Sequence, residues 1–263
     1  YELPFTRHVP RTLRGFEFSI VTHRGCIGNC SFCALKLIQG ENIISRSEES
    51  ILREIEALTK HPQFKGNIDD LGGPSANMYG MDCPINCMRE CIECNRLPDN
   101  NEKLITLLRK ARSVPGVKHV YIRSGVRYDL ASDAYIKELI NNGHIYKTLR
   151  IAPEHVDKNV LQLMRKDKGN LEEFRKKFAA QPPDKNLSYY FITAHPGSSM
   201  KEAQELAEYI KKNKLEADVQ VFTPTPMTDS TSQYHTGMDE QGKKVYVPYS
   251  YKEKKEQKRL TTN

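Results

Sequence analysis

Short apolar segments alternate along this chain with longer segments in which apolar residues recur every three or four positions. The short segments are rich in β-branched and aromatic residues, which is typical of strands. They lie at 16–22, 68–71, 117–122, 149–151, 187–193 and 219–222. The longer segments predict helices around 51–58, 104–108, 136–140, 160–164 and 200–212. The pattern therefore predicts six strands, with a helix after each of the first five.

Alternation of this kind predicts a parallel sheet with right-handed crossovers, either an open doubly wound sheet or a barrel. Parallel α/β folds form their sites at the carboxyl ends of strands, and a barrel brings all these ends to one mouth. Glycine, proline and polar residues follow every predicted strand, at Cys26, Gly72-Gly73-Pro74, Arg123-Ser124-Gly125, Pro153-Glu154-His155, His195-Pro196-Gly197 and Pro224-Thr225-Pro226. The alternative is that these glycines and prolines only mark loops, where both residues are common. We expect an α/β fold, a partial (β/α)6 barrel with parallel strands and outer helices.

The composition is that of a somewhat polar globular protein, with 38% apolar and 28% charged residues among 263. No stretch approaches the about 18 consecutive apolar residues that cross a bilayer. Glu2, Arg7, Arg11 and Arg14 place charges where a signal peptide needs an apolar core. We therefore expect a cytoplasmic protein with no membrane partner. The missing initiator methionine suggests a fragment or a processed chain.

The net charge of +7 is concentrated near the end of the chain. Residues 243–263 hold seven Lys or Arg and two Glu, so they contribute +5. We expect a core at 1–242 and a basic C-terminal tail at 243–263. The tail is either solvated or a nucleic-acid contact, because Tyr246, Tyr249 and Tyr251 are interleaved with its lysines.

The seven cysteines fall into two groups rather than being scattered. One group is Cys26, Cys30 and Cys33, and the other is Cys83, Cys87, Cys91 and Cys94. An odd number of thiols in two clusters, in a chain without an export signal, indicates metal binding rather than a disulfide framework.

The first group has the spacing C-x3-C-x2-C, which would also place three core cysteines on one face of a helix. Gly25, Gly28 and Asn29 argue for a loop instead, because each weakens a helix and suits turns. Thiolates are the usual ligands of iron–sulfur clusters. Three of them leave one iron of a four-iron cluster without a protein ligand, and such an open position is a reaction site.

This motif after a first strand resembles the signature of the radical S-adenosylmethionine (SAM) superfamily. Further blocks resemble its YgiQ-type branch in the same order. They are residues 19–26, Asp70-Leu71-Gly72-Gly73-Pro74-Ser75-Ala76-Asn77-Met78, Ser124-Gly125-Val126-Arg127-Tyr128-Asp129, Ala152-Pro153-Glu154-His155, Ala194-His195-Pro196-Gly197 and Tyr234-His235-Thr236-Gly237. Members of that branch carry an additional N-terminal region, so this chain resembles their catalytic core alone.

The resemblance implies that Cys26, Cys30 and Cys33 hold a 4Fe-4S cluster and that Phe32 lies against the adenine of SAM. It implies that Gly72, Gly73 and Pro74 replace the superfamily's glycine motif, whose backbone receives the methionine amino group. Ser124 and Glu154 are candidate partners of ribose or carboxylate, and Arg123 of the SAM carboxylate, or they cap strand ends. His155 and His195 either position substrate and relay protons, as catalytic candidates, or are structural.

The implied activity is reductive cleavage of SAM to methionine and a 5′-deoxyadenosyl radical, with an external electron donor. The radical then abstracts hydrogen from an unknown substrate, a small molecule, peptide or RNA. The alternative is a non-catalytic iron–sulfur or zinc module whose basic tail contacts nucleic acid.

The second cysteine group lies in a long connection, which we expect to be an insertion at about 74–101. Cys83, Cys87, Cys91 and Cys94 would form one stripe of a helix opening at Pro84. On a straight helix the first and last of them would stand about 16 Å apart, too far for one metal. The group is either a second metal centre, iron–sulfur or zinc, with a bent segment, or a cysteine-lined core helix.

Overall fold

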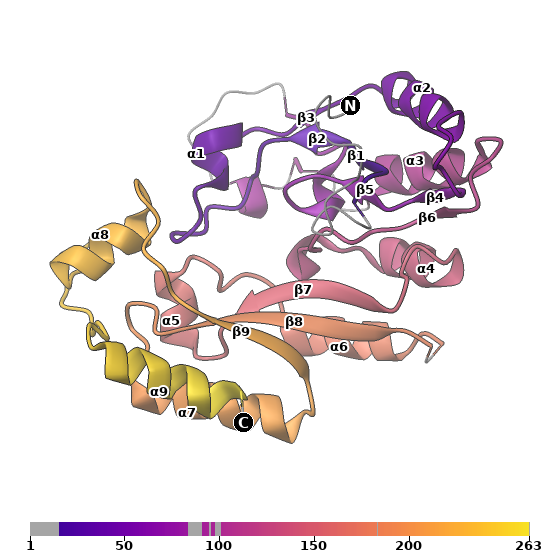
Figure 1. Cartoon of the computed structure of the whole chain (residues 1–263). Helices are drawn as coiled ribbons and strands as arrows, with labels where there is room; N and C mark the ends of the chain where they lie inside the picture. The colour runs from indigo at the N-terminus through magenta and orange to yellow at the C-terminus, as the bar shows by residue number, and fades with distance from the viewer. Residues whose placement is uncertain (1–15, 84–90, 95, 98–100, 183, 263) are drawn as a thin grey trace.

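Parallel strands line a curved sheet in the computed structural model of the chain, which describes residues 16–83, 91–94, 96–97, 101–182 and 184–262. The strands follow one another in space in the order of the chain (Figure 1). β1 (Ser19–Val21) pairs with β5 (Asp70–Gly72), and β4 (Asn67–Ile68) pairs with β6 (His119–Val120). β7 (Thr148–Glu154), β8 (Asn186–Thr193) and β9 (Glu216–Val221) form the other half. All these pairs are parallel.

Single hydrogen bonds and bridges join the pairs into one curved array. The amide of Leu71 donates to the carbonyl of Tyr121, and the amide of Ile122 donates to that of His144. A parallel bridge between Val126 and Ile151 then leads to β7. The predicted (β/α)6 partial barrel is thus confirmed. The strand predicted at 68–71 is divided into β4, which pairs with β6, and β5, which pairs with β1.

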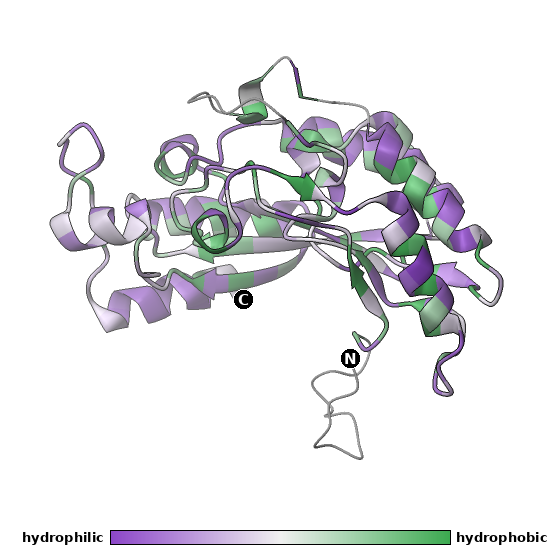
Figure 2. Ribbon diagram, turned by 90° about the horizontal axis from the view of Figure 1, so that it is seen from above, coloured by the Kyte–Doolittle hydropathy of each residue, from purple (hydrophilic) through white to green (hydrophobic). Residues whose placement is uncertain are grey.

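Helices cover the outer face of this array. They are α2 (Glu48–Thr59), α3 (Glu102–Ser113), α4 (Asp133–Asn141), α5 (Lys158–Leu163), α6 (Leu171–Ala179) and α7 (Met200–Lys212). Their apolar sides face the strands and their polar sides face outward (Figure 2). Most begin at a side-chain cap, and Ser199 with Glu202 forms a capping box at the start of α7. The sheet and these helices enclose the main core, in which Ile51, Leu107 and Phe191 are fully buried.

Smaller elements surround the carboxyl ends of the strands. β2 (His23–Arg24) and β3 (Ile44–Ser45) form an antiparallel ribbon, and α1 (Leu35–Gln39) lies between them in the chain. Short 3-10 helices occur at Ala76–Met78, Cys91–Glu93 and Tyr128–Leu130. α8 (Asp229–Thr236) lies at the same end of the molecule as α1 (Figure 1).

The residues expected as a basic tail contain a packed helix, α9 (Tyr251–Thr262), which lies against α7 and β9 (Figure 1). Gln257 and Thr261 on this helix are buried, although its other side chains are largely polar. The segment predicted as a basic tail is therefore packed against the core along α9, while its basic side chains lie mostly on the outer face. The boundary at 242/243 and the insertion at 74–101 stay predictions.

Candidate functional site

The first cysteine group lies in a loop between β2 and α1, so the interpretation as three core cysteines on a helix is wrong. Gly25 has φ +87°, and a Cβ there would stand 1.9 Å from the Asn42 carbonyl oxygen. Only glycine fits this close approach, which turns the chain into the loop. Cys26 is buried and Cys30 and Cys33 are half-buried, all with free thiols.

The three thiols influence one another electrostatically. Burial raises the pKa of Cys33, and the charges of Cys30 and Cys26 raise it further. Burial also raises the pKa of Cys26, while the backbone of Gly28 and the charge of Arg127 lower it. Thiols of this kind become thiolates when they bind metal, because a coordinated thiol loses its proton.

The chemistry of three neighbouring thiols fits a four-iron cluster. Among the residues that the structure describes, no three His, Cys, Asp or Glu side chains converge on one metal ion. In a four-iron cluster each thiolate binds a different iron, so the sulfur atoms need not converge on one point. Gly28 admits the Arg127 guanidinium next to the loop, because a Cβ there would lie 2.4 Å from Arg127 Nη1 and 3.3 Å from Cys26 Sγ.

Arg127 is a site residue that the sequence analysis did not single out. Its Nη1 donates to Cys30 Sγ over 3.6 Å, while Nε and Nη2 donate to the carboxylate of Asp129. Burial opposes its charge, yet Asp129 and Cys30 together raise the pKa of Arg127 above its usual value. The signal lies in the block Arg127-Tyr128-Asp129, but the sequence does not show that this pair is buried.

A pocket of about 530 Å³ opens beside Cys33 at the carboxyl ends of β7, β8 and β9. Phe32, Glu154, Tyr190 and Phe222 are among its lining residues. This volume lies in the range of small-molecule sites. Of the predicted cofactor-binding residues, Phe32 and Glu154 are thus brought together next to the cysteine loop.

Glu154 ends β7 with a buried carboxyl group and φ 71°. Its Oε2 has no hydrogen-bond partner in the described part of the chain. Burial raises the pKa of Glu154 to about 7, and the charges of Lys166 and Arg127 only partly oppose this. The carboxyl group therefore has an acceptor atom available for a polar ligand in the pocket.

We expect the cluster-free parent chain to lose stability relative to Glu154→Gln as the pH rises from 5 to 8. The buried His155 and His195, whose pKa values are lowered, have the opposite pH dependence in both proteins and cancel in this comparison. The folded pKa of Glu154, about 7, lies above the ordinary 4.5, so the stabilisation from proton uptake is complete below pH 4.5 and disappears as the pH rises through 7. The difference is roughly 3 kcal/mol in the free energy of unfolding. Urea titrations at both pH values measure it, and an unchanged pH dependence in the variant would contradict the assignment.

The glycine motif contacts protein groups. Ser124 Oγ donates to the carboxylate of Asp70, which also accepts from the amides of Arg123 (2.8 Å) and Ser124 (3.1 Å). A Cβ on Gly72 would lie 3.0 Å from Ser124 Oγ, and one on Gly73 would lie 2.5 Å from the His23 ring. The absence of these Cβ atoms admits the Ser124 side chain, which follows β6, and the His23 ring of β2 next to the end of β5. The predicted roles of Gly72, Gly73, Pro74, Arg123 and Ser124 toward SAM stay predictions.

The two histidine candidates are buried and neutral. Burial lowers the pKa of His195 to about 3 and that of His155 to about 4. The Nδ1–H of His195 donates to the Pro196 carbonyl over 2.7 Å, so Nε2 accepts from Ser230 Oγ over 2.7 Å. Nδ1 of His155 accepts from the amide of Asp157. These bonds favour the structural interpretation, and a catalytic role for either ring stays a prediction.

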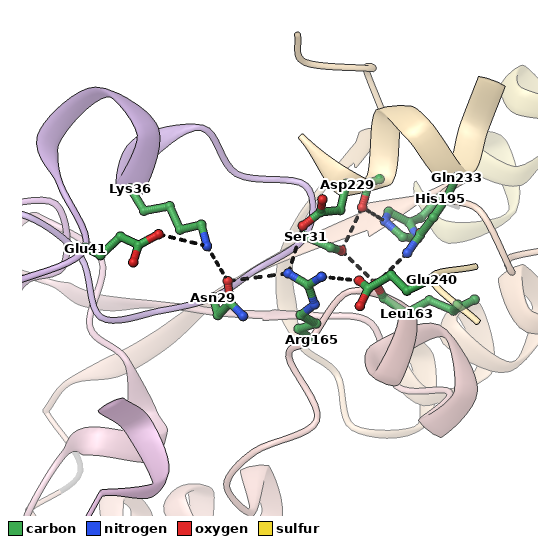
Figure 3. A network of polar contacts seen from close by, with 11 residues as sticks. Asn29, Ser31, Lys36, Glu41, Leu163, Arg165, His195, Asp229, Gln233 and Glu240 are labelled. Carbon is green, nitrogen blue, oxygen red and sulfur yellow. Dashed lines mark hydrogen bonds and ion pairs between the residues drawn. The ribbon is translucent and has the colours of Figure 1, made fainter. Parts of the chain in front are cut away.

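His195 belongs to a network that anchors the cysteine loop (Figure 3). Because Ser230 donates to His195, Ser31 Oγ is the donor over the 2.7 Å to Ser230 Oγ, and it shares its proton with the carbonyl of Leu163, also at 2.7 Å. Arg165 connects the same loop to α8, because it bonds both Asn29 and Asp229. Residues separated by 199 positions thus fix the loop that carries Cys30 and Cys33.

Three members of the second cysteine group are described. Cys91 and Cys94 border the 3-10 helix Cys91–Glu93, and Cys91 packs against a cluster that contains Cys26, Met78 and Met81. Cys87, and Pro84 with the helix predicted to open there, lie outside the described residues. A second metal centre stays a prediction.

A curved parallel α/β sheet with a three-cysteine loop at its carboxyl end defines a radical SAM protein. The model of the radical SAM superfamily matches residues 20–210, and the chain belongs to this superfamily. Within it, the chain is 45% identical to a UPF0313 protein of Methanocaldococcus jannaschii over 99% of its own length and 47% of that protein's. A UPF0313 protein of Methanosarcina acetivorans is also 45% identical, over 99% of this chain and 38% of that protein. These relatives agree with the YgiQ-type branch, and the chain spans less than half of their length.

Solved structures share the fold at low sequence identity. A radical SAM methyltransferase, TsrM, of Kitasatospora setae, solved with cobalamin and a [4Fe-4S] cluster, superposes with a TM-score of 0.58 at 12% identity, over 84% of this chain and 40% of that one. Coproporphyrinogen III oxidase (HemN) of Escherichia coli gives 0.52 at 15% identity, over 92% and 50%. In the described part of our chain, no helix has the length and apolarity to cross a membrane.

Proposed function

We propose that this chain is the catalytic core of a radical SAM enzyme, formed by residues 1–242, in which Cys26, Cys30 and Cys33 hold a 4Fe-4S cluster and SAM binds at its free iron. When bound, these groups supply reductive cleavage of SAM to methionine and a 5′-deoxyadenosyl radical that takes hydrogen from a substrate. The observation that carries the proposal is the position of the loop: Cys30 faces the buried cation of Arg127, and Cys33 lines the 530 Å³ pocket.

The chain's own residues would bind and orient SAM in this pocket. Phe32 offers an aromatic face, and its ring lies 6.3 Å from that of His195, which keeps it in place. Glu154 offers its free carboxyl oxygen to a ribose hydroxyl or the amino group. Gly72, Gly73 and Pro74, with Arg123 and Ser124, lie at the ends of the neighbouring strands and complete the proposed site.

The substrate class is a small molecule, peptide or RNA, and the electron comes from an external donor. The proposed cytoplasmic location provides the reducing conditions that clustered thiols need. Contact between nucleic acid and the segment 243–263 belongs to the proposal's alternative, the non-catalytic metal module.

Anaerobic reconstitution with iron and sulfide tests the proposal. A sample that carries the cluster is mixed with SAM and dithionite, and 5′-deoxyadenosine is measured by chromatography. Formation of 5′-deoxyadenosine is the expected result. A cluster-loaded sample that leaves SAM intact would overturn the enzyme and favour the non-catalytic module.

A double variant with Cys87→Ala and Cys91→Ala tests the second metal centre. We expect this variant to lose the iron or zinc of the second group and to keep the iron of the first group. Cys26, Cys30 and Cys33 in the loop are unchanged. Metal analysis of the purified, reconstituted protein provides the measurement. Metal content equal to that of the parent would favour a packing role, which agrees with the packing of Cys91 against the cluster that contains Met78 and Met81.

A further inference from the structure

A buried ion pair faces the cysteine loop from the turn after β6. The side chains of Arg127 and Asp129 are only 5% and 2% exposed, and their closest approach is 2.5 Å. Buried charges interact strongly because little water screens them. The pair therefore acts on whatever charge the neighbouring thiols carry.

The guanidinium of Arg127 binds Asp129 with one side and Cys30 with the other. Nε and Nη2 bond the two carboxylate oxygens of Asp129 over 3.1 and 2.5 Å, so Nη1 is left to donate to Cys30 Sγ over 3.6 Å. The backbone of Arg127 is clamped by Asn77, whose side chain accepts from its amide (3.0 Å) and donates to its carbonyl (2.8 Å). The cation cannot swing away from the sulfur without breaking these contacts.

Two glycines leave room for the pair. A Cβ on Gly28 would lie 2.4 Å from Arg127 Nη1, and one on Gly169, which has φ +83°, would lie 2.5 Å from Asp129 Cβ. The chain thus packs backbone closely around both charges, one from the cysteine loop and one from the connection between α5 and α6. Close packing on both sides fixes their distance from Cys30.

We propose that Arg127 and Asp129 together set the reduction potential of the cluster held by Cys26, Cys30 and Cys33, an inference that rests on the proposed function. The step is the uptake of one electron from an external low-potential donor, in which no bond forms or breaks and Arg127 keeps its proton. A cation bonded to a ligand sulfur stabilises the added negative charge, since charge and hydrogen bonds at the sulfurs tune such potentials. Asp129 lies on the far edge of the guanidinium and offsets part of this stabilisation.

Substitutions that remove one charge of the pair should therefore shift the midpoint potential of the cluster in opposite directions. Arg127→Gln removes the positive charge and should lower the midpoint potential, whereas Asp129→Asn leaves the cation without its counterion and should raise it. We expect each shift to change the ratio of reduced to oxidised cluster at least tenfold at a fixed solution potential, which is about 59 mV for one electron. Arg24→Gln is the matched control, because it removes the same charge from an exposed side chain two residues before Cys26.

The experiment is a redox titration of the reconstituted protein without SAM, followed by electron paramagnetic resonance. Opposite shifts in the two variants, with none in the control, are the expected result. Wild-type potentials in both cluster-loaded variants, or shifts of the same sign, would overturn the inference. Should Arg127→Gln fail to fold, the isosteric Asp129→Asn decides alone, because an unchanged or lower potential in it contradicts the tuning role.

Failure of this inference is distinguishable from failure of the proposed function. If the parent chain carries a cluster and cleaves SAM while the potentials stay unchanged, only the tuning role is wrong. If Arg127→Gln keeps its potential but binds SAM at least tenfold more weakly by equilibrium dialysis, the residue is a SAM ligand and the tuning role is overturned. A parent chain that assembles no cluster contradicts the proposed function itself.

Discussion

Replacing Cys30 by alanine is expected to abolish SAM cleavage and to remove the iron bound by the loop. A cluster held by three thiolates does not survive the loss of one, because the loop then offers only Cys26 and Cys33. Cys30 is also the sulfur that accepts the Arg127 hydrogen bond, so the substitution leaves a buried cation without that partner. The measurements are iron per chain after anaerobic reconstitution and 5′-deoxyadenosine after addition of SAM and dithionite.

Cys83→Ala serves as the control for thiol loss, since Cys83 belongs to the second group and lies outside the loop. It should retain SAM cleavage. Circular dichroism shows whether Cys30→Ala keeps its fold, which we expect because the thiol is only half-buried. Full SAM cleavage by a folded Cys30→Ala protein would show that the ligands have been assigned to the wrong residues.

Replacing Gln257 by leucine is expected to lower the free energy of unfolding by about 3–5 kcal/mol. The fully buried amide accepts from Thr193 Oγ1 and the amide of Ala194, and it donates to the Ser198 carbonyl. Leucine satisfies none of these groups, and each buried polar group left without a partner costs about 1–3 kcal/mol. Ala194 has φ 58°, so the substitution also removes a hydrogen bond that holds this left-handed turn directly after β8.

Denaturant unfolding of the purified chain measures this loss. Lys255→Ala is the matched control on the same helix, because Lys255 is exposed and its removal should change the free energy by less than about 0.5 kcal/mol. If Gln257→Leu lowered the free energy of unfolding by less than about 1 kcal/mol, the prediction would be wrong. The hydrogen bonds of Gln257 would then contribute little to holding α9 against the core.

The elements that the sequence predicts well are those whose apolar pattern matches their packing. The helix predicted at 200–212 has the bounds of α7, Met200–Lys212, because a capping box starts it and its buried residues recur at helical spacing. The helix α9 was missed for the opposite reason. It is held by Gln257 through hydrogen bonds rather than by an apolar stripe, so its sequence resembles a solvated charged segment.

Some residues of the candidate site could be predicted from the sequence and others could not. The cysteine loop could be predicted because its chemistry depends on residue types at fixed spacing, and Phe32 and Glu154 accompany it in the pocket. Arg127 could not, because only the fold shows that the charge is buried and aimed at Cys30. His195 presents the converse, since its burial and two satisfied ring nitrogens favour the structural one of the two roles that the sequence left open.

The hydrogen bonds between Ser31 and Ser230 have a consequence for synthesis on the ribosome. The amide and hydroxyl of Ser230 bond the carbonyl and hydroxyl of Ser31, so the loop carrying Cys30 lacks these contacts until Ser230 has been translated. A nascent chain at that stage already displays all seven thiols. We therefore expect iron delivered before α8 has docked to be held less selectively than iron delivered after it has docked.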